Sequence, residues 1–151
     1  MTEQVTKTVI VKRDVNTVFT VWSNFETFPY FMKYVEQVEK TGPRTSHWQV
    51  KGPLGVTVDW NAETTRVDHN KRIGWNTKDN GGTITTSGEV VFTELPHDET
   101  QITVTMNYSP PAGKLGEAVA QLFSDPEKRL EEDLRNFKGY MENGSNSASM
   151  N

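Results

Sequence analysis

The three histidines are the first candidates for acid–base chemistry, because only histidine ordinarily changes its charge near neutral pH. His69 lies in "RVDHNKR" and His97 in "LPHDET", and both segments have the composition of hairpin turns. His47 alternates with Trp48, so it is expected to face water if Trp48 faces the core. None of the three has a visible partner, and no histidine is predicted to be catalytic.

Carboxylates offer no better pair. Asp59 and Glu63 share one face of a predicted strand, but four residues of strand separate them by about 13 Å, too far to share a proton. The run Glu131, Glu132 and Asp133 is expected on the exposed side of a helix. We therefore predict no catalytic carboxylate pair.

Metal and cofactor motifs are also missing from the sequence. There is no cysteine, and the histidines and acidic residues do not have the spacing of a metal site. The segment "SPPAGKLG" places glycines and a lysine before a helix but lacks the Gly-Lys-Ser/Thr end of a phosphate-binding loop. We predict no metal and no cofactor.

Aromatic side chains are the remaining candidates for binding or chemistry. Trp48, Trp60 and Trp75 fall on one face of the predicted strands, where each indole offers an N–H donor to an otherwise apolar space. Tyr108 adds a hydroxyl near a strand–helix junction and is a weak candidate for a proton donor. Arg72 and Asn76 would join this face only if the register of their strand were shifted by one residue.

The N-terminal third contains a strand and two short helical segments. Residues 5–12 alternate as a strand does. Asp14 is placed as an N-cap, and the apolar residues after it recur at helical spacing. The segment 25–31, with Pro29 inside it, is expected to be a second short helix or a turn.

A meander of strands follows. "SHWQVKGPLGVTVDWNAETTRV" reads as two strands joined by the turn Gly52-Pro53-Leu54-Gly55. "KRIGWNTK", "TSGEVVFTEL" and "TQITVTMNY" continue the same period of two. This alternation predicts an antiparallel sheet with one face in water and one face covered.

The C-terminal segment has the pattern of the helix that covers the sheet. Its apolar residues recur three and four positions apart, and they are Leu115, Val119, Leu122, Phe123, Leu130, Leu134, Phe137 and Met141. Ser124-Asp125-Pro126-Glu127 resembles a capping box, so a long helix is expected to restart or kink near Pro126.

The fold class is α+β. Residues 1–142 are expected to form a single domain, and residues 143–151, rich in Ser and Asn, a flexible tail.

Composition excludes two classes of partner. The net charge is -4, and the 16 basic residues are scattered rather than gathered in a stripe, so no nucleic-acid binding is predicted. No run approaches the roughly 20 apolar residues of a membrane span. The N-terminus lacks the features of a signal peptide, and the absence of cysteine fits a reducing compartment, so a cytoplasmic location is expected.

Several of these segments carry a family resemblance. The run "WSNFETFPYFMKYVEQVE", the "GPLG" turn, the three spaced tryptophans and the "YSPPAGKLG" junction resemble the START-like, helix-grip (SRPBCC) superfamily over roughly residues 3–142. Within it the chain is similar to the polyketide cyclase/dehydrase branch, which also holds coenzyme Q-binding and lipid-transfer proteins. The resemblance implies a curved antiparallel sheet wrapped around a long C-terminal helix, with two short helices near the mouth of a cavity.

The resemblance and the covered face of the sheet together predict a set of ligand-binding residues. The set consists of Phe28, Phe31, Met32, Trp48, Trp60, Trp75, Phe92, Met106, Tyr108, Leu122, Phe123 and Leu130. The aromatic residues 28–32 either line the mouth of the cavity or cap the open end of the sheet as plain core, since both draw on the same residue types.

Three functions follow as hypotheses. The first is a carrier or sensor that binds a hydrophobic small molecule such as a lipid, a quinone or an aromatic polyketide-like compound. The second is a cyclase or dehydratase, which requires at least one buried titratable group. The third is a protein-interaction domain with a vestigial cavity, in which the acidic helix face meets a partner protein.

Overall fold

The computed structural model describes residues 3–51, 55, 57–78, 85–109 and 126–144. Its strands form one antiparallel sheet in the order β1-β7-β6-β5-β4-β3-β2. The strands are β1 (Glu3–Val11), β2 (Val35–Lys40), β3 (Thr45–Lys51), β4 (Thr57–Asp68), β5 (Arg72–Lys78), β6 (Thr85–Leu95) and β7 (Glu99–Ser109). Strands β2 to β7 are a continuous meander, which confirms the predicted topology, and β1 adds to its β7 edge.

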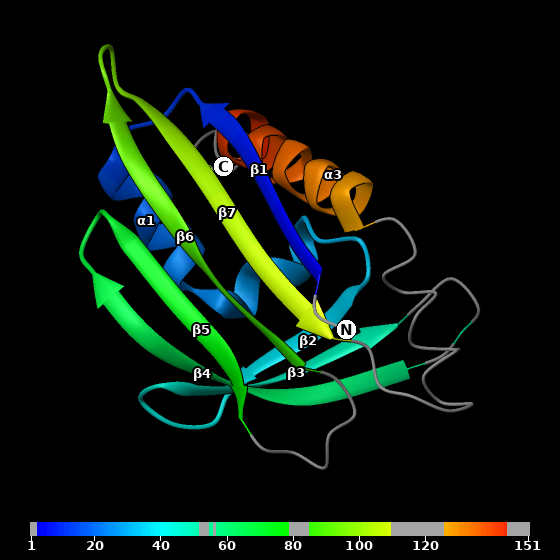
Figure 1. Cartoon of the computed structure of the whole chain (residues 1–151). Helices are drawn as coiled ribbons and strands as arrows, with labels where there is room; N and C mark the ends of the chain where they lie inside the picture. Colours follow the sequence, from blue (N-terminus) through cyan, green and yellow to red (C-terminus); the bar gives the residue numbers. More distant parts are fainter. Residues whose placement is uncertain (1–2, 52–54, 56, 79–84, 110–125, 145–151) are drawn as a thin grey trace.

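The helices lie on the inner side of this curved sheet (Figure 1). They are α1 (Val15–Ser23), the 3₁₀ helix η1 (Phe25–Tyr30), α3 (Pro126–Gly139) and a final π turn η2 (Tyr140–Gly144). The turn Gly52-Pro53-Leu54 and the apolar residues Leu115 and Val119 lie outside the described residues. The order strand, two short helices, meander and long helix is the predicted α+β arrangement.

The first helix begins where its cap predicts. Asp14 has extended backbone, and its carboxylate accepts hydrogen bonds from the Thr17 backbone N–H at 3.0 Å and the Thr17 hydroxyl at 2.7 Å. These two bonds satisfy donors that a helix N-terminus otherwise leaves free. Val18, Phe19 and Trp22 are thereby turned toward the sheet and are buried.

We expect Asp14→Ala to lower the free energy of unfolding by about 1 kcal/mol, as the loss of an N-cap does. The Thr17 hydrogen bonds lower the pKa of Asp14. The stabilisation is therefore present above the pKa of an unfolded aspartate and is lost as the pH falls through the lower folded value. Urea unfolding at pH 7 tests this. Asp14→Asn, which keeps a capping oxygen, should retain most of the stability, and an equal loss in both variants would contradict the cap.

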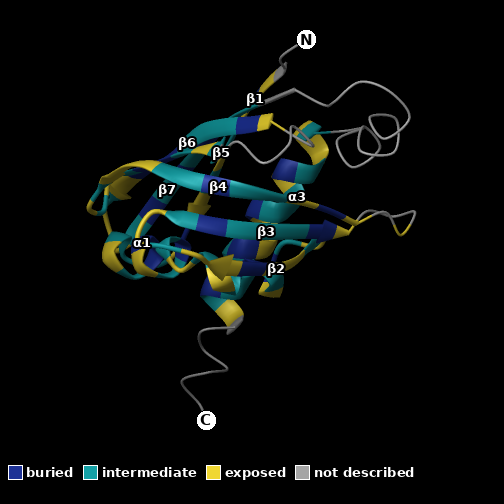
Figure 2. Ribbon diagram, turned by 90° about the horizontal axis from the view of Figure 1, so that it is seen from below, coloured by how far each residue is buried: buried dark blue, intermediate teal, exposed yellow. Residues whose placement is uncertain are grey.

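Helix α3 is held against the sheet by an apolar stripe. Leu130, Leu134, Phe137 and Met141 are buried, as their spacing predicts, and α3 packs along β1. Phe137 is fully buried, with its ring centroid 4.9 Å from that of Trp22 and 5.0 Å from that of Phe31. Figure 2 shows that buried positions recur along the strands and on α3.

Polar contacts fix the position of α3 along β1. Lys138 Nζ donates to the carbonyl oxygen of Ile10 at 2.8 Å, and Glu142 accepts from the Lys12 backbone N–H at 2.8 Å. Near the start of the helix, Glu131 lies 3.5 Å from Lys7. Because both ends are tied to β1, the side chains of α3 that face the sheet have a fixed position.

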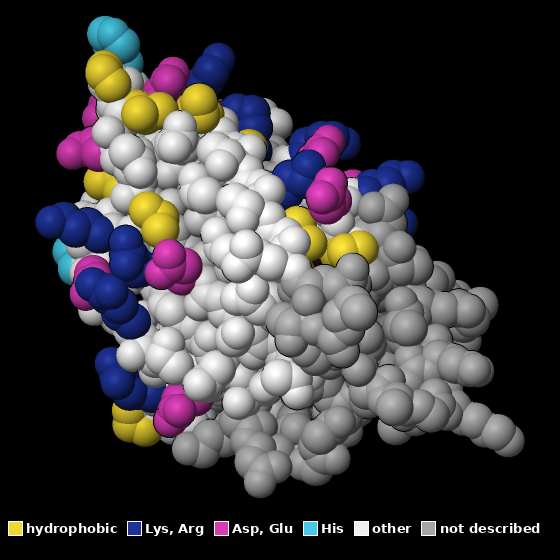
Figure 3. Space-filling model, in the orientation of Figure 1, with side chains coloured by type: hydrophobic (Ala, Val, Ile, Leu, Met, Phe, Trp, Pro, Cys, Tyr) yellow, Lys and Arg dark blue, Asp and Glu magenta, His cyan; other side chains and the backbone are white. Residues whose placement is uncertain are grey.

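The outer face of the sheet is polar. Thr6 pairs with Thr105 and Thr8 with Thr103 through hydroxyl hydrogen bonds of 3.3 and 3.1 Å. Side chains of both charge signs are scattered over the face shown in Figure 3 and do not gather into a basic patch there. Among the described helices, none is long and apolar enough to cross a membrane.

Candidate functional site

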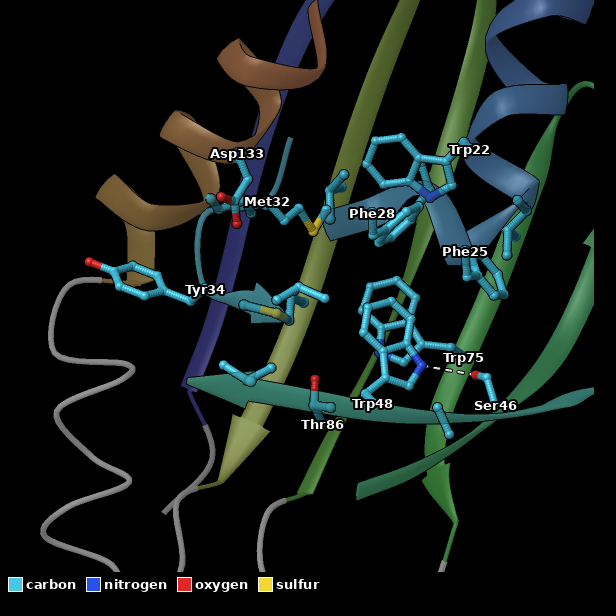
Figure 4. A pocket seen from close by; sticks show the side chains of 18 of the residues that line it. Trp22, Phe25, Phe28, Met32, Tyr34, Ser46, Trp48, Trp75, Thr86 and Asp133 are labelled. Atoms are coloured by element: carbon cyan, nitrogen blue, oxygen red, sulfur yellow. Dashed lines mark hydrogen bonds between the residues drawn. The ribbon is translucent and has the colours of Figure 1, made fainter. Parts of the chain in front are cut away.

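A cavity of about 210 Å³ lies between the concave face of the sheet and the first turns of α3 (Figure 4). Helix α1, η1 and the segment that follows η1 close it on one side. Its described lining is Trp22, Phe25, Phe28, Met32, Tyr34, Val35, Ser46, Trp48, Val50, Trp60, Ala62, Thr64, Ile73, Trp75, Thr86, Val90, Val104, Met106, Pro126, Arg129, Leu130 and Asp133. Most of these side chains are apolar or aromatic, as in a site for a hydrophobic molecule.

Tryptophans form one wall. Trp48 and Trp60 are directly opposite each other on β3 and β4, and their rings are parallel within 5° with centroids 6.3 Å apart. The Trp48 indole N–H donates to the Ser46 hydroxyl at 2.9 Å, and the Phe28 ring packs against Trp48 at 5.3 Å. These contacts hold a flat aromatic surface in place beside the cavity.

Beside the cavity, α3 contacts the segment that follows η1. The Arg129 guanidinium lies 4.2 Å from the centroid of the Tyr34 ring, a cation–π contact. One turn further along α3, Asp133 accepts a hydrogen bond from the backbone N–H of Lys33 and projects into the space beside Met32 (Figure 4). The segment after η1 is therefore joined to α3 at two points.

Asp133 is the titratable carboxyl of the described lining. Burial among apolar side chains raises its pKa from 3.8 to about 7, and the neighbouring Glu132 carboxylate acts in the same direction. The Arg129 guanidinium and the Lys33 N–H lower the pKa by smaller amounts. The result is a carboxyl group that exchanges its proton near neutral pH within an apolar cavity.

This placement of Asp133 corrects the expectation that Glu131, Glu132 and Asp133 all lie on the exposed side of α3. Asp133 follows Leu130 by three residues and precedes Leu134 by one. At 3.6 residues per turn, it therefore lies at the edge of the buried stripe. The spacing of the apolar residues does not indicate that a polar residue at that edge is buried.

The predicted ligand-binding residues divide into three groups. Those that line the cavity are Phe28, Met32, Trp48, Trp60, Trp75, Met106 and Leu130. The backbone of Tyr108 pairs with Thr86 in the sheet. The side chain of Tyr108, and the whole of Leu122 and Phe123, lie outside the described part of the chain.

The third group, Phe31 and Phe92, is buried in the core and is absent from the described lining. Phe31 follows η1 and packs on Phe137 at 5.0 Å, because the end of that helix turns it toward α3. Phe92 lies near the end of β6 that α1 covers, and it packs on Phe19 at 5.2 Å. The segment 28–32 thus contributes to both lining and core.

Several lining residues were missed by reading the sequence. Ser46 and Thr86 lie on the covered face of their strands. Ser46 is two residues before Trp48, so the alternation that identified Trp48 places Ser46 on the same face. Trp22 belongs to the buried stripe of α1, and Arg129 lies beside Leu130 on α3. Ser46, Thr86 and Arg129 were missed because side chains of these polar types are mostly exposed in folded proteins.

The histidines lie away from the described lining of the cavity. His47 faces the outer side of the sheet, as predicted, where Nδ1 lies 2.8 Å from Asn61 Oδ1 and Nε2 3.3 Å from Asp59 Oδ2. The His69 ring packs edge-on against Phe19 at 5.3 Å, and His97 occupies a turn with φ of 65°. The described residues contain no group of three or more His, Asp or Glu side chains that could hold a metal ion.

Comparison with known proteins agrees with this architecture. The chain is 31% identical over 139 residues to an uncharacterized 17.2 kDa protein of Streptomyces lincolnensis, which covers 92% of this chain and 89% of that protein. A crystal structure from Deinococcus radiodurans matches with a TM-score of 0.73 at 31% identity, covering 94% of this chain and 98% of the other.

More distant structures share the fold. The Zhui aromatase/cyclase of a Streptomyces species has a TM-score of 0.76 at 18% identity, covering 94% of each chain. A START superfamily protein of Mycobacterium smegmatis has a TM-score of 0.73 at 18% identity, covering 92% of this chain and 97% of the other. These two matches confirm the predicted helix-grip fold.

The family comparison covers most of the chain. The model for "Polyketide cyclase / dehydrase and lipid transport" matches residues 11–135, which run from the end of β1 into α3 and include every described lining residue of the cavity. Together with the relatives at 31% identity, this match shows that the chain belongs to the polyketide cyclase/dehydrase and lipid transport family.

Proposed function

We propose that the protein binds a compact hydrophobic molecule in the cavity between the sheet and α3, as a carrier or sensor. The observation that carries the proposal is the apolar lining with its tryptophan wall. A cavity of about 210 Å³ is somewhat larger than the ~150 Å³ that takes up benzene in an engineered protein core. It therefore suits a small aromatic molecule or the ring of a longer lipid, quinone or polyketide-like compound.

Native mass spectrometry of the purified protein, followed by organic extraction, tests the proposal directly. A retained apolar compound in stoichiometric amount would support it and identify the chemical class. The gain on binding comes from removing apolar surface from water, at about 25 cal/mol per Å² before the costs of association. A protein without bound compound that also fails to take up naphthalene, lipids or quinones would favour the protein-interaction alternative.

Filling the cavity is expected to abolish this binding. Ala62 is buried on β4 and belongs to the lining, so Ala62→Leu places extra carbon atoms in the ligand space. We expect naphthalene affinity, measured by isothermal titration calorimetry, to fall by roughly tenfold or more because the space is no longer open. Thr57→Leu, on the exposed face of the same strand, is the matched control and should bind as the wild type does. Equal binding by all three proteins would place the ligand elsewhere.

A second candidate function is supported by Asp133. A dehydratase needs a group that removes a proton from the carbon next to a carbonyl and then protonates the departing hydroxyl, releasing water and regenerating the carboxylate. A carboxyl whose pKa is about 7 suits both steps near neutral pH. The test is conversion of a β-hydroxyketone to the unsaturated ketone by the wild type but not by Asp133→Asn.

A further inference from the structure

Thr86 is a buried hydroxyl at the sheet side of the cavity. It lies on β6, opposite Tyr108 of β7, and only 7% of its surface is exposed. Its Oγ1 is shielded from solvent and has no hydrogen-bond partner among the residues that the structure describes. Figure 4 shows the hydroxyl directed from the strand toward the side chains that line the cavity.

Two other polar groups of the described lining already have partners. The Ser46 hydroxyl accepts from the Trp48 indole, and the Asp133 carboxyl accepts from the Lys33 backbone. An unsatisfied buried hydroxyl lowers the stability of the folded protein, whereas valine has nearly the same shape and avoids that loss. A threonine at this position is therefore unfavourable for stability unless a ligand supplies its partner.

We propose that Thr86 is the specificity-determining residue of the cavity, and that its hydroxyl selects compact aromatic ligands that carry a hydroxyl or carbonyl oxygen. The inference rests on the proposed binding function. A threonine hydroxyl both donates and accepts, so either kind of ligand oxygen satisfies it. A plain hydrocarbon leaves it unpaired, and the discrimination comes from that unpaired group. The parallel rings of Trp48 and Trp60 provide a flat wall for the ligand ring.

The experiment compares two probes of nearly equal shape, naphthalene and 2-naphthol, by isothermal titration calorimetry. For the wild type we expect 2-naphthol to bind roughly tenfold more tightly, the effect of one added hydrogen bond. In Thr86→Val the ratio should fall to about one, chiefly through weaker naphthol binding. Thr86→Ser keeps the hydroxyl and should restore the preference. Thr85→Val, at the neighbouring exposed position of β6, is the control and should keep the wild-type ratio.

The outcomes separate this inference from the proposed function. If both probes bind the wild type equally, or if Thr86→Val keeps the preference, the cavity binds apolar ligands but Thr86 does not select among them. If neither probe binds, the proposed function fails and the inference fails with it. Thermal unfolding of the ligand-free proteins is a second, independent test. Removing an unpaired hydroxyl should leave Thr86→Val as stable as the wild type or more stable. Marked destabilisation would mean that Thr86 has a partner within the protein, which would overturn the inference.

Discussion

Replacing Asp133 with asparagine is expected to raise the stability of the protein at pH 8 and to weaken its dependence on pH. The carboxyl lies in the apolar cavity beside Met32, and its pKa is raised from 3.8 to about 7, mainly by burial. Asparagine has the same shape, carries no charge, and retains an oxygen for the Lys33 N–H. The substitution therefore removes a buried charge without removing the hydrogen bond to Lys33.

The direction of the effect follows from proton binding. Between pH 4 and pH 7 the folded protein holds a proton on Asp133 that the unfolded chain has released, so the free energy of unfolding falls as the pH rises through this range. The raised pKa thus contributes stability that is fully present below about pH 4 and is lost by pH 7. A shift from 3.8 to about 7 corresponds to roughly 4 kcal/mol, and Asp133 keeps some exposure, so we expect about 2–4 kcal/mol.

Thermal unfolding at pH 5 and pH 8 measures this difference. At pH 8 the Asp133→Asn variant should melt roughly 5–15 °C above the wild type. At pH 5 the difference should be less than half as large, because much of the stabilising proton binding to Asp133 is still present there. Glu94→Gln, at an exposed position of β6, is the control and should change stability by no more than about 0.5 kcal/mol. Equal melting temperatures of Asp133→Asn and wild type at pH 8 would show that Asp133 does not hold a buried charge there.

A role of the Asp133 carboxyl in the chemistry of the cavity would explain why a destabilising group is present at this position. The same substitution that stabilises the protein at pH 8 should remove any proton transfer that the cavity performs, since asparagine cannot exchange a proton in this range. A stabilised but inactive variant would support the dehydratase candidate. If the wild type shows no turnover and the stabilised variant still binds apolar probes, the carrier function is favoured.

Much of the fold could be predicted from the sequence because each element carries its own period. Alternation in residues 45–68 places Trp48 and Trp60 on one covered face, and their direct pairing across β3 and β4 confirms it. Asp14 marks the start of α1, and the stripe from Leu130 to Met141 marks the buried side of α3. These patterns depend on local geometry and on burial, which a single sequence records well.

The site was harder to predict because its polar members are exceptions to those patterns. Asp133 and Thr86 lie on faces that the pattern assigns to apolar residues. Aspartate and threonine are residue types that usually face solvent. Whether an aromatic residue lines a cavity or fills the core depends on packing between distant segments. Phe28 lines the cavity and Phe31 packs on Phe137, although only two residues separate them. No local period distinguishes the two.

The floor of the cavity depends on a glycine that carries no side-chain chemistry. Gly88 of β6 lies directly opposite Trp75 of β5 and Met106 of β7. A Cβ atom at Gly88 would lie 2.1 Å from the Thr105 carbonyl oxygen and 2.8 Å from Cη2 of the Trp75 ring. The ring occupies the space that any larger residue would need, so the absence of a side chain at Gly88 permits Trp75 to line the cavity.

Gly88→Ala is therefore expected to lower the free energy of unfolding by about 3 kcal/mol or more, because the backbone of β7 or the ring of Trp75 has to move. Urea unfolding measures the loss, and near-ultraviolet circular dichroism reports the altered environment of the indole. Gly139→Ala in α3 is the matched control, since a Cβ there meets nothing within 4 Å and alanine favours a helix. If Gly88→Ala is as stable as the wild type, the close approach of Trp75 is not a constraint on the cavity. If it is destabilised and also loses naphthalene binding, the shape of the ligand site depends on a position that the ligand itself need not touch.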